Sequence, residues 1–421
     1  MYFPFTKDEV LECMSQSPLG GTVYLYDEAT IIERANRVQG MLDGNFFAQK
    51  ASPFGPILDV IAATGMGQDC ATITELKSAR ARRACQGQEL FFTSAATDFT
   101  LPGGENEFVV AHQMGAILNI GKASYVDKIL DLIGDPGDSI FCLRYNPGDM
   151  QSGDEIIGEP VKTPFGDTLE NLIEGYRKLA ERGVKRFALH TMVGGGMLDV
   201  EYFAITAKLL ADAARRIEDE TGIDLEIINV GGGMGIPYRP EQSEIDIDAV
   251  SEVIREQLDE FDCRIVSEFG RYITGPAGWL ATSLTHGVVH TYENHLPVNH
   301  SPNNSARFAS ISNVFHKTHV IGKDSAPSVK VSLHGQQCSG SNKYLEGISV
   351  PKDIESGDIL VIHDAGAHMA GNRTYYNSLS TAAGFMKRTD GSIIKVHEGV
   401  TPEQIMALNG INLPGIESLD G

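Results

Sequence analysis

A lysine at the end of a short apolar run is the residue of this chain best suited to covalent chemistry. The run Phe46-Phe47-Ala48-Gln49-Lys50 is followed by Ser52-Pro53. We therefore expect the amine at the mouth of a buried strand, where loss of water favours its uncharged form. An uncharged lysine can form a Schiff base with a carbonyl compound. Because most lysines are ordinary surface residues, this interpretation depends on the residues that accompany it.

Further polar residues lie where other predicted strands end. If the strands form a parallel barrel, their carboxyl ends meet at one rim, and these side chains converge there. The residues are Asp69, Arg144, His190, the glycines Gly231, Gly232 and Gly233, and Glu268. Core packing alone does not explain polar residues at all of these positions.

Three of these features have a structural explanation besides a chemical one. The triple glycine lets backbone N–H groups approach an anion such as a phosphate, or it makes a tight turn out of a strand. Glu268, which precedes Arg271 by three residues, can hold a pyridine nitrogen protonated or make an ion pair at the rim. His190 can stack on a flat ring or be a core histidine.

The elements that must position these residues alternate between strand and helix from about residue 40 to residue 280. Eight such units in roughly 250 residues favour a closed (β/α)8 TIM barrel. An open doubly wound sheet is the alternative, but no GxGxxG follows the first strand. The predicted strands are 45–49, 68–71, 90–93, 116–120, 139–145, 186–190, 226–230 and 264–268, with helices including 74–85, 169–182, 202–221 and 247–261.

After Trp279 the alternation stops, and the sequence predicts a C-terminal antiparallel β domain. Its strands are expected at 281–292, 328–334, 358–363 and 392–398, with turn-like segments between them. The strand predicted at 22–26 joins this domain, because it has no helix partner. We expect a barrel of residues 30–280 and a β-rich domain of residues 1–29 plus 281–421.

Composition limits the class of protein and its partners. The 421 residues are 42% hydrophobic and 21% charged, as in a soluble globular protein with two domains. A net charge of −22 disfavours nucleic acid and anionic membranes. The six scattered cysteines predict neither a disulfide framework nor a metal site. No signal peptide or membrane span is apparent, so we expect a cytoplasmic protein.

The ordered set of motifs resembles the fold-type III pyridoxal-phosphate decarboxylases, the group of diaminopimelate decarboxylase and eukaryotic ornithine decarboxylase. In the barrel, residues 48–52 resemble A-V-K-A-N, residues 68–71 resemble F-D-V-A-S, and residues 231–233 and 268–271 match G-G-G and E-P-G-R. In the β domain, residues 334–338 resemble G-P-x-C, residues 357–358 and 364–367 match G-D and D-A-G-A, and residues 375–377 resemble N-Y-N. The matches run in order over nearly the whole chain.

The resemblance implies pyridoxal 5'-phosphate (PLP) as the cofactor and a role for each matching residue. Lys50 would carry the Schiff base, Glu268 would pair with the pyridine nitrogen, and His190 would stack on the ring. The phosphate would be surrounded by Gly231, Gly232, Gly233, Arg271 and Tyr376. The orienting residues would be Asp69, Glu75 and Arg144.

The resemblance also implies a head-to-tail homodimer in which the β domain completes the active site. Cys338 would reach the partner's site and return a proton to Cα after CO₂ leaves. This would make the chain a lyase of amino-acid metabolism that catalyses α-decarboxylation.

Departures from the family's motifs gather where a substrate would lie. The acidic residue that often follows the cysteine is Ser339, and the family's H-x-G-S is replaced by residues 190–194, His-Thr-Met-Val-Gly. The tyrosine that often follows D-A-G-A is His368, and Arg307-Phe308-Ala309 matches only part of R-P-A-L-Y. Candidate substrate contacts are Arg144, Arg307 and Ser339. The sequence therefore predicts a non-standard amino acid or amino-acid conjugate as substrate.

Two alternatives stay open. An amino-acid racemase or epimerase of the alanine racemase type shares the fold, but it places an arginine at the pyridine nitrogen, and Glu268 argues against it. An inactive homologue that acts as a binding protein would not need Lys50, Glu268, His190 and Cys338 together.

Overall fold

The computed structural model describes residues 2–81, 89–94, 100, 103–153, 158–305, 307–310, 314–323 and 327–411. The chain divides into two compact units. One is Thr30–Gly275, and the other joins Met1–Ala29 to Pro276–Gly421. Each unit has its own sheets and core.

The unit Thr30–Gly275 is built on eight parallel strands that follow each other in chain order. They are β2 (Phe46–Ala48), β3 (Gly67–Cys70), β4 (Leu90–Thr93), β5 (Ile117–Ile120), β6 (Ile140–Tyr145), β7 (Arg186–Thr191), β8 (Leu225–Asn229) and β9 (Arg264–Val266). The last strand meets the first: Phe46 N–H donates to Ser267 O at 2.8 Å, and Asn45 Oδ1 accepts the Ser267 hydroxyl at 2.8 Å. The predicted closed barrel is confirmed, and an open sheet is excluded.

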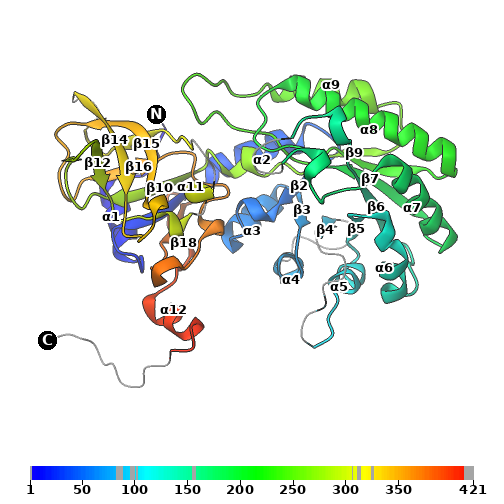
Figure 1. The fold of residues 1–421 in the computed structure, drawn as a ribbon, viewed down its shortest axis with the longest axis horizontal. Helices are drawn as coiled ribbons and strands as arrows, with labels where there is room; N and C mark the ends of the chain where they lie inside the picture. The colour runs from blue at the N-terminus through cyan, green and yellow to red at the C-terminus, as the bar shows by residue number, and fades with distance from the viewer. Residues whose placement is uncertain are drawn as a thin grey trace. The chain divides into compact units, whose positions relative to one another are not determined.

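Helices follow most strands and cover the outside of the barrel, as α6 to α9 show in Figure 1. They begin and end where the sequence supplies caps: α8 starts after Asp199, whose carboxylate accepts Glu201 N–H, and stops at Gly222, with φ of 72°. The helices of this unit are α2 (Glu28–Gln39), α3 (Gly55–Ala63), α4 (Ile73–Ala81), α5 (Glu107–Gln113), α6 (Val126–Ile133), α7 (Leu169–Glu181), α8 (Val200–Thr221), α9 (Ile247–Leu258) and α10 (Arg271–Thr274). Residues 82–85 of the predicted helix 74–85 lie outside the described residues.

The second unit contains a six-stranded sheet in the order β13-β16-β10-β1-β17-β18 and a four-stranded sheet in the order β11-β12-β14-β15. The strands are β1 (Thr22–Asp27), β10 (Gly278–Ser283), β11 (Val289–His290), β12 (Asn294–Pro297), β13 (Thr318–Val320), β14 (Ser328–His334), β15 (Lys343–Pro351), β16 (Ile359–Ile362), β17 (Ala383–Lys387) and β18 (Ile393–His397). Its helices are α1 (Lys7–Ser15), α11 (Arg307–Ser310) and α12 (Pro402–Leu408).

The N-terminal strand joins this β unit as predicted, between β10 and β17. Most pairings are antiparallel, but β1 runs parallel to β17 and β12 runs parallel to β14. The strand predicted over 281–292 is two strands, because the chain bends through residues 285–287 between β10 and β11. Helix α1 packs Val10, Cys13 and Met14 into the core around Trp279.

Among the described residues, no helix is both long and apolar enough to cross a membrane. The same residues hold no cluster of His, Cys, Asp and Glu that could bind a metal ion. The cytoplasmic location remains a prediction.

Candidate active site

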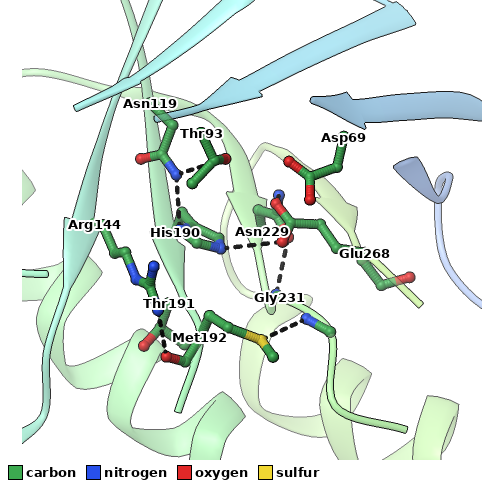
Figure 2. Close-up of polar contacts among 12 residues, drawn as sticks. Asp69, Thr93, Asn119, Arg144, His190, Thr191, Met192, Asn229, Gly231 and Glu268 are labelled. Carbon is green, nitrogen blue, oxygen red and sulfur yellow. Dashed lines mark hydrogen bonds and ion pairs between the residues drawn. The ribbon is translucent and has the colours of Figure 1, made fainter. Parts of the chain in front are cut away.

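A polar layer lies at the carboxyl end of the barrel, directly above an apolar one. Side chains two positions apart on a strand point to the same face, so each apolar residue in the barrel is followed two positions later by a residue nearer the rim. Phe91, Ile117, Cys142, Ala188, Ile227 and Val266 fill the barrel as part of one buried cluster. The residues two positions further on are Thr93, Asn119, Arg144, His190, Asn229 and Glu268, most of which Figure 2 shows grouped together.

Lys50 lies at this rim, but in a different conformation and environment than predicted. Strand β2 ends at Ala48, and Lys50 belongs to the 3₁₀ turn Gln49–Ala51. Its side chain is 53% exposed, and Nζ lies 3.7 Å from Asp69 Oδ2. The expectation of a desolvated amine is therefore wrong for the free chain, because the turn carries Lys50 out of the strand and into contact with water.

A close packing contact brings the Lys50 turn to the Glu268 segment. A Cβ on Gly270 would lie 2.9 Å from Ala51 Cβ and 3.4 Å from Ala48 Cβ. Glycine is the residue that allows this approach. Gly270 thus allows the segment that contains Glu268 and Arg271 to lie beside the turn that carries Lys50.

Asp69 is buried within this group at 2% exposure. Burial and the neighbouring charge of Glu268 raise the pKa of Asp69 to about 8, against the attraction of Lys50. Asp69 is therefore mostly protonated at neutral pH. Its neighbour Glu75 on α4 accepts the Ala71 N–H at 2.7 Å and anchors the end of β3.

Two buried glutamines lie behind Lys50, where the motifs that this chain resembles have valine and phenylalanine. Gln49 Nε2 donates to Gln68 Oε1 at 2.7 Å and to Glu75 O at 3.1 Å. Gln49 is 1% exposed and Gln68 is fully buried. Because a buried amide is costly without a partner, these bonds fix the Lys50 turn to β3 and α4.

Glu268 and His190 form the centre of the polar layer (Figure 2). Asn229 Nδ2 donates to Glu268 Oε1 at 2.9 Å, and His190 Nε2 lies 3.4 Å from Glu268 Oε2. Burial would raise the pKa of Glu268, but His190, Lys50 and Arg144 lower it below its ordinary value. Glu268 is therefore a buried carboxylate whose position is fixed.

His190 is enclosed, with 1% of its surface exposed. Burial lowers its pKa, against the opposing effect of Glu268, so the ring is neutral near pH 7. Asn119 Nδ2 lies 2.8 Å from His190 Nδ1 and also donates to Thr93 Oγ1 at 3.2 Å. With the amide in this orientation, the ring proton is on Nε2 and faces Glu268.

Arg144 adds positive charge to the layer from the neighbouring strand, in register with His190. Its Nη2 donates to Met192 O at 2.8 Å, and its guanidinium lies over the Phe165 ring at 5.1 Å from the centroid. Burial lowers the pKa of Arg144, while Glu268 and Asp69 raise it. Arginine remains charged at neutral pH despite this shift.

The triple glycine lets the loop after β8 approach the loop after β7 more closely than side chains would allow. A Cβ on Gly231 or on Gly233 would collide with the carbonyl oxygen of Thr191 or Gly194, and both glycines have positive φ, 74° and 102°. Gly231 N–H already donates to Asn229 Oδ1 at 2.8 Å. The turn interpretation is confirmed at Gly231, and anion binding by the amides that follow it stays a prediction.

Arg271 lies at the start of α10, close behind Glu268 in sequence, but it does not make the alternative rim ion pair. Its Nη1 donates to the Tyr238 hydroxyl at 3.0 Å, whereas Glu268 contacts Asn229 and His190. Arg271 is 8% exposed, and its bond to Tyr238 joins it to the loop that begins with the triple glycine. A role of Arg271 at the cofactor phosphate stays a prediction.

The remaining predicted residues belong to the second unit. Cys338 is an exposed free thiol in the loop between β14 and β15, where its N–H donates to Asn377 Oδ1 at 2.7 Å. The Tyr376 hydroxyl donates to Cys338 O at 3.4 Å, a contact that the sequence did not predict; the roles of Tyr376 at the phosphate and of Cys338 in the partner's site stay predictions. Arg307 lies buried at the start of α11.

Ser339 belongs to a neutral polar cluster in the same loop. Gln337 Nε2 donates to Ser339 Oγ at 2.8 Å and to Ser341 Oγ at 2.9 Å, and the two hydroxyls lie 2.7 Å apart. The cluster carries no formal charge. It is the surface that the loop presents next to Cys338.

Sequence reasoning missed several members of the site, among them Asn119, Asn229 and Tyr238, and it noted Met192 only as part of the changed segment 190–194. A signal existed for the two asparagines: each is the next-to-last residue of a predicted strand, close to the end that His190 marks on its own strand. Met192 and Tyr238 lie in loops after β7 and β8, where no periodicity marks them.

Comparison with known proteins gives consistent matches over most of the chain. The family described as "Pyridoxal-dependent decarboxylase, pyridoxal binding domain" matches residues 28–275. Protein TabA of Pseudomonas amygdali pv. tabaci is 27% identical over 387 residues, covering 90% of this chain and 88% of that protein. Diaminopimelate decarboxylase of Methanothermobacter thermautotrophicus is 26% identical over 410 residues, covering 94% and 92%.

Solved structures share the fold. Diaminopimelate decarboxylase from Helicobacter pylori, complexed with L-lysine, has a TM-score of 0.81 at 21% identity and covers 92% of this chain and 96% of its own. Lysine decarboxylase from Selenomonas ruminantium has a TM-score of 0.78 at 18% identity and covers 93% and 98%. Both the barrel and the β-rich unit therefore have counterparts in these two solved structures.

Proposed function

This chain belongs to the pyridoxal-dependent decarboxylase family, and we propose that it removes the α-carboxyl group of a non-standard amino acid or amino-acid conjugate. In this proposal, Lys50 holds PLP through a Schiff base. The observation that carries the proposal is Glu268, a buried carboxylate fixed between Asn229 and His190 at the rim where Lys50 lies. Such a carboxylate keeps a pyridine nitrogen protonated and makes the ring a strong acceptor of electrons.

The residues present fit PLP at both of its ends. Lys50 offers an amine to the aldehyde, and Glu268 offers an acceptor to the ring nitrogen. At the other end, Arg271 and the amides after Gly231 offer donors to a phosphate. The loop there leaves no room for side chains, since a Cβ on Gly232 would lie 2.9 Å from Glu268 O.

We propose the following division of work for the barrel residues. PLP, when bound, accepts the electron pair that CO₂ leaves behind. Glu268 holds a proton on the ring nitrogen, and His190, neutral because it is buried, can lie against the ring without adding charge. Asp69 is 3.7 Å from Lys50 Nζ and can exchange a proton with that amine, since its pKa of about 8 keeps both forms available.

We propose that the proton returns to Cα from Cys338 of a second copy of the chain. Cys338 is exposed and is held by Asn377 and Tyr376, so its thiol is presented outward from the β-rich unit. This assignment requires a homodimer with two shared sites.

Mixing two inactive variants tests the shared site. Lys50→Ala and Cys338→Ala chains should each be inactive alone. After random exchange of subunits, about a quarter of the wild-type activity should return, because half of the dimers are mixed and one of their two sites is intact. If Cys338 serves the barrel of its own chain, every site in the mixture lacks one residue and no activity returns.

The neutral cluster around Ser339 supports a substrate without a distal ammonium group. Gln337, Ser339 and Ser341 bond to each other and offer hydroxyl and amide groups next to Cys338. A charged amine would find no compensating charge among them. We therefore place a neutral, polar or acidic side chain ahead of ornithine, lysine or diaminopimelate, although relatives of this chain are named diaminopimelate decarboxylases.

Release of CO₂ from a panel of amino acids of both chiralities, with acyl and acidic conjugates included, tests the proposal. We expect PLP-dependent release from a member without a distal amine, at a rate well above that from lysine, ornithine or diaminopimelate. Inversion of chirality without CO₂ release would instead identify a racemase. Fastest release from a substrate with a distal ammonium would contradict the assignment of the Ser339 cluster.

A further inference from the structure

Met192 lies against the loop to which we assign the cofactor phosphate. It follows directly after β7, and its Sδ accepts the Gly232 N–H at 3.2 Å (Figure 2). Its own carbonyl oxygen accepts Arg144 Nη2 at 2.8 Å. The backbone of Met192 is thus fixed while its side chain reaches across to the next loop.

The acceptor at Gly232 differs in kind from the acceptor at Gly231. Gly231 N–H donates to an amide oxygen, Asn229 Oδ1, at 2.8 Å. Gly232 N–H instead has a thioether, which is a weak acceptor on a flexible side chain. An anion can therefore accept the Gly232 N–H by displacing only the sulfur of Met192. To accept the Gly231 N–H, it would have to break the stronger bond to Asn229 Oδ1.

The backbone of Gly232 also has little room to move. A Cβ on Gly232 would lie 2.9 Å from Glu268 O and 3.6 Å from Met192 Sδ. The loop is packed against the Glu268 segment on one side and against the methionine on the other. Of these two neighbours, the flexible side chain of Met192 is the one that can move.

We propose that Met192 is a displaceable cap on the Gly232 amide, which the phosphate of the cofactor must move aside. Met192 therefore sets the affinity for the phosphate end of PLP and has little effect on the ring end. This inference rests on the cofactor site proposed above. It concerns a position where the family's H-x-G-S motif has glycine and this chain has a thioether.

Comparison of PLP with pyridoxal, which lacks the phosphate, isolates this effect. The Kd of each compound is measured by absorbance on the cofactor-free protein, for the wild type and Met192→Ala. Removing the cap should tighten PLP by about three- to tenfold, the scale of one modest hydrogen bond, and leave pyridoxal unchanged. Met192→Leu, which keeps the bulk without the acceptor, should bind PLP more weakly than Met192→Ala does.

Met197→Ala is the matched control, since Met197 lies in the same loop and packs near Gly194 rather than on Gly232. An equal change for PLP and pyridoxal in Met192→Ala, weaker PLP binding, or the same tightening in Met197→Ala would overturn the proposal. A wild-type protein that binds pyridoxal and PLP equally would also overturn it. Absence of PLP binding in every variant would refute the cofactor site itself, whereas failure of the cap leaves wild-type PLP binding intact.

Discussion

Lys50→Ala should abolish the borohydride-reducible PLP adduct and lower CO₂ release by about a thousandfold or more, the scale of losing a positioned catalytic group. The reason is geometric. The turn Gln49–Ala51 presents the Lys50 amine at the barrel rim beside Asp69, and Gly270 holds that turn against the Glu268 segment. The adduct is measured by reduction with borohydride followed by peptide mapping, and CO₂ release is measured on the same preparations.

Lys77→Ala is the matched control for this experiment. The Lys77 side chain is 49% exposed and pairs with Glu105 at 2.7 Å, so its exposure is close to the 53% of Lys50, and it contacts a carboxylate as Lys50 does. It should keep both the adduct and the activity. A Lys50→Ala protein that still forms a reducible adduct at full occupancy would show that another amine carries the cofactor.

The barrel and the location of the site could be predicted because both depend on patterns along single strands. Alternation of strand and helix indicated the fold, and polar residues at several strand ends indicated the rim. Asp69, Arg144, His190 and Glu268 were found by this reasoning, and the structure places all four in one polar layer.

Other features depend on relations between strands, which spacing along the chain does not contain. The Gln49–Gln68 bond, the Asn229–Glu268 bond and the contact of Met192 with Gly232 each join residues from different strands or loops. The exposure of Lys50 depends on β2 ending at Ala48, and strand ends are the least predictable part of an element. The strands β12, β13, β15 and β17 were missed. β12 and β13 are short, whereas β15 (Lys343–Pro351) is long but contains Gly347 with φ of 71°, which interrupts its pattern.

Glu268→Gln should lower CO₂ release by about 10² to 10³ while the protein still binds PLP. Glutamine keeps the size of the side chain but removes the charge that holds a proton on the ring nitrogen. The change has a second consequence in the cofactor-free protein. Burial and the Glu268 charge together raise the pKa of Asp69 to about 8, so removing the second cause should lower the pKa of Asp69. An NMR titration of the Asp69 carboxyl measures this shift.

That shift reports an electrostatic role for Glu268 when the fold around Asp69 is intact, because glutamine keeps the size of the side chain and removes only its charge. Asp69 is protonated in the folded wild type below about pH 8, and in Glu268→Gln its ionisation should begin at lower pH. Loss of packing would also lower this pKa, because burial is the larger cause of its rise, so the NMR signals of the surrounding core must stay unchanged in Glu268→Gln for the shift to report the lost charge. Glu107→Gln, which alters another buried carboxylate that accepts from Ser94, should leave the Asp69 titration and the rate unchanged. If Glu268→Gln releases CO₂ at the wild-type rate, the reaction does not need a protonated ring nitrogen. The buried carboxylate of Glu268 would then no longer support the proposed function.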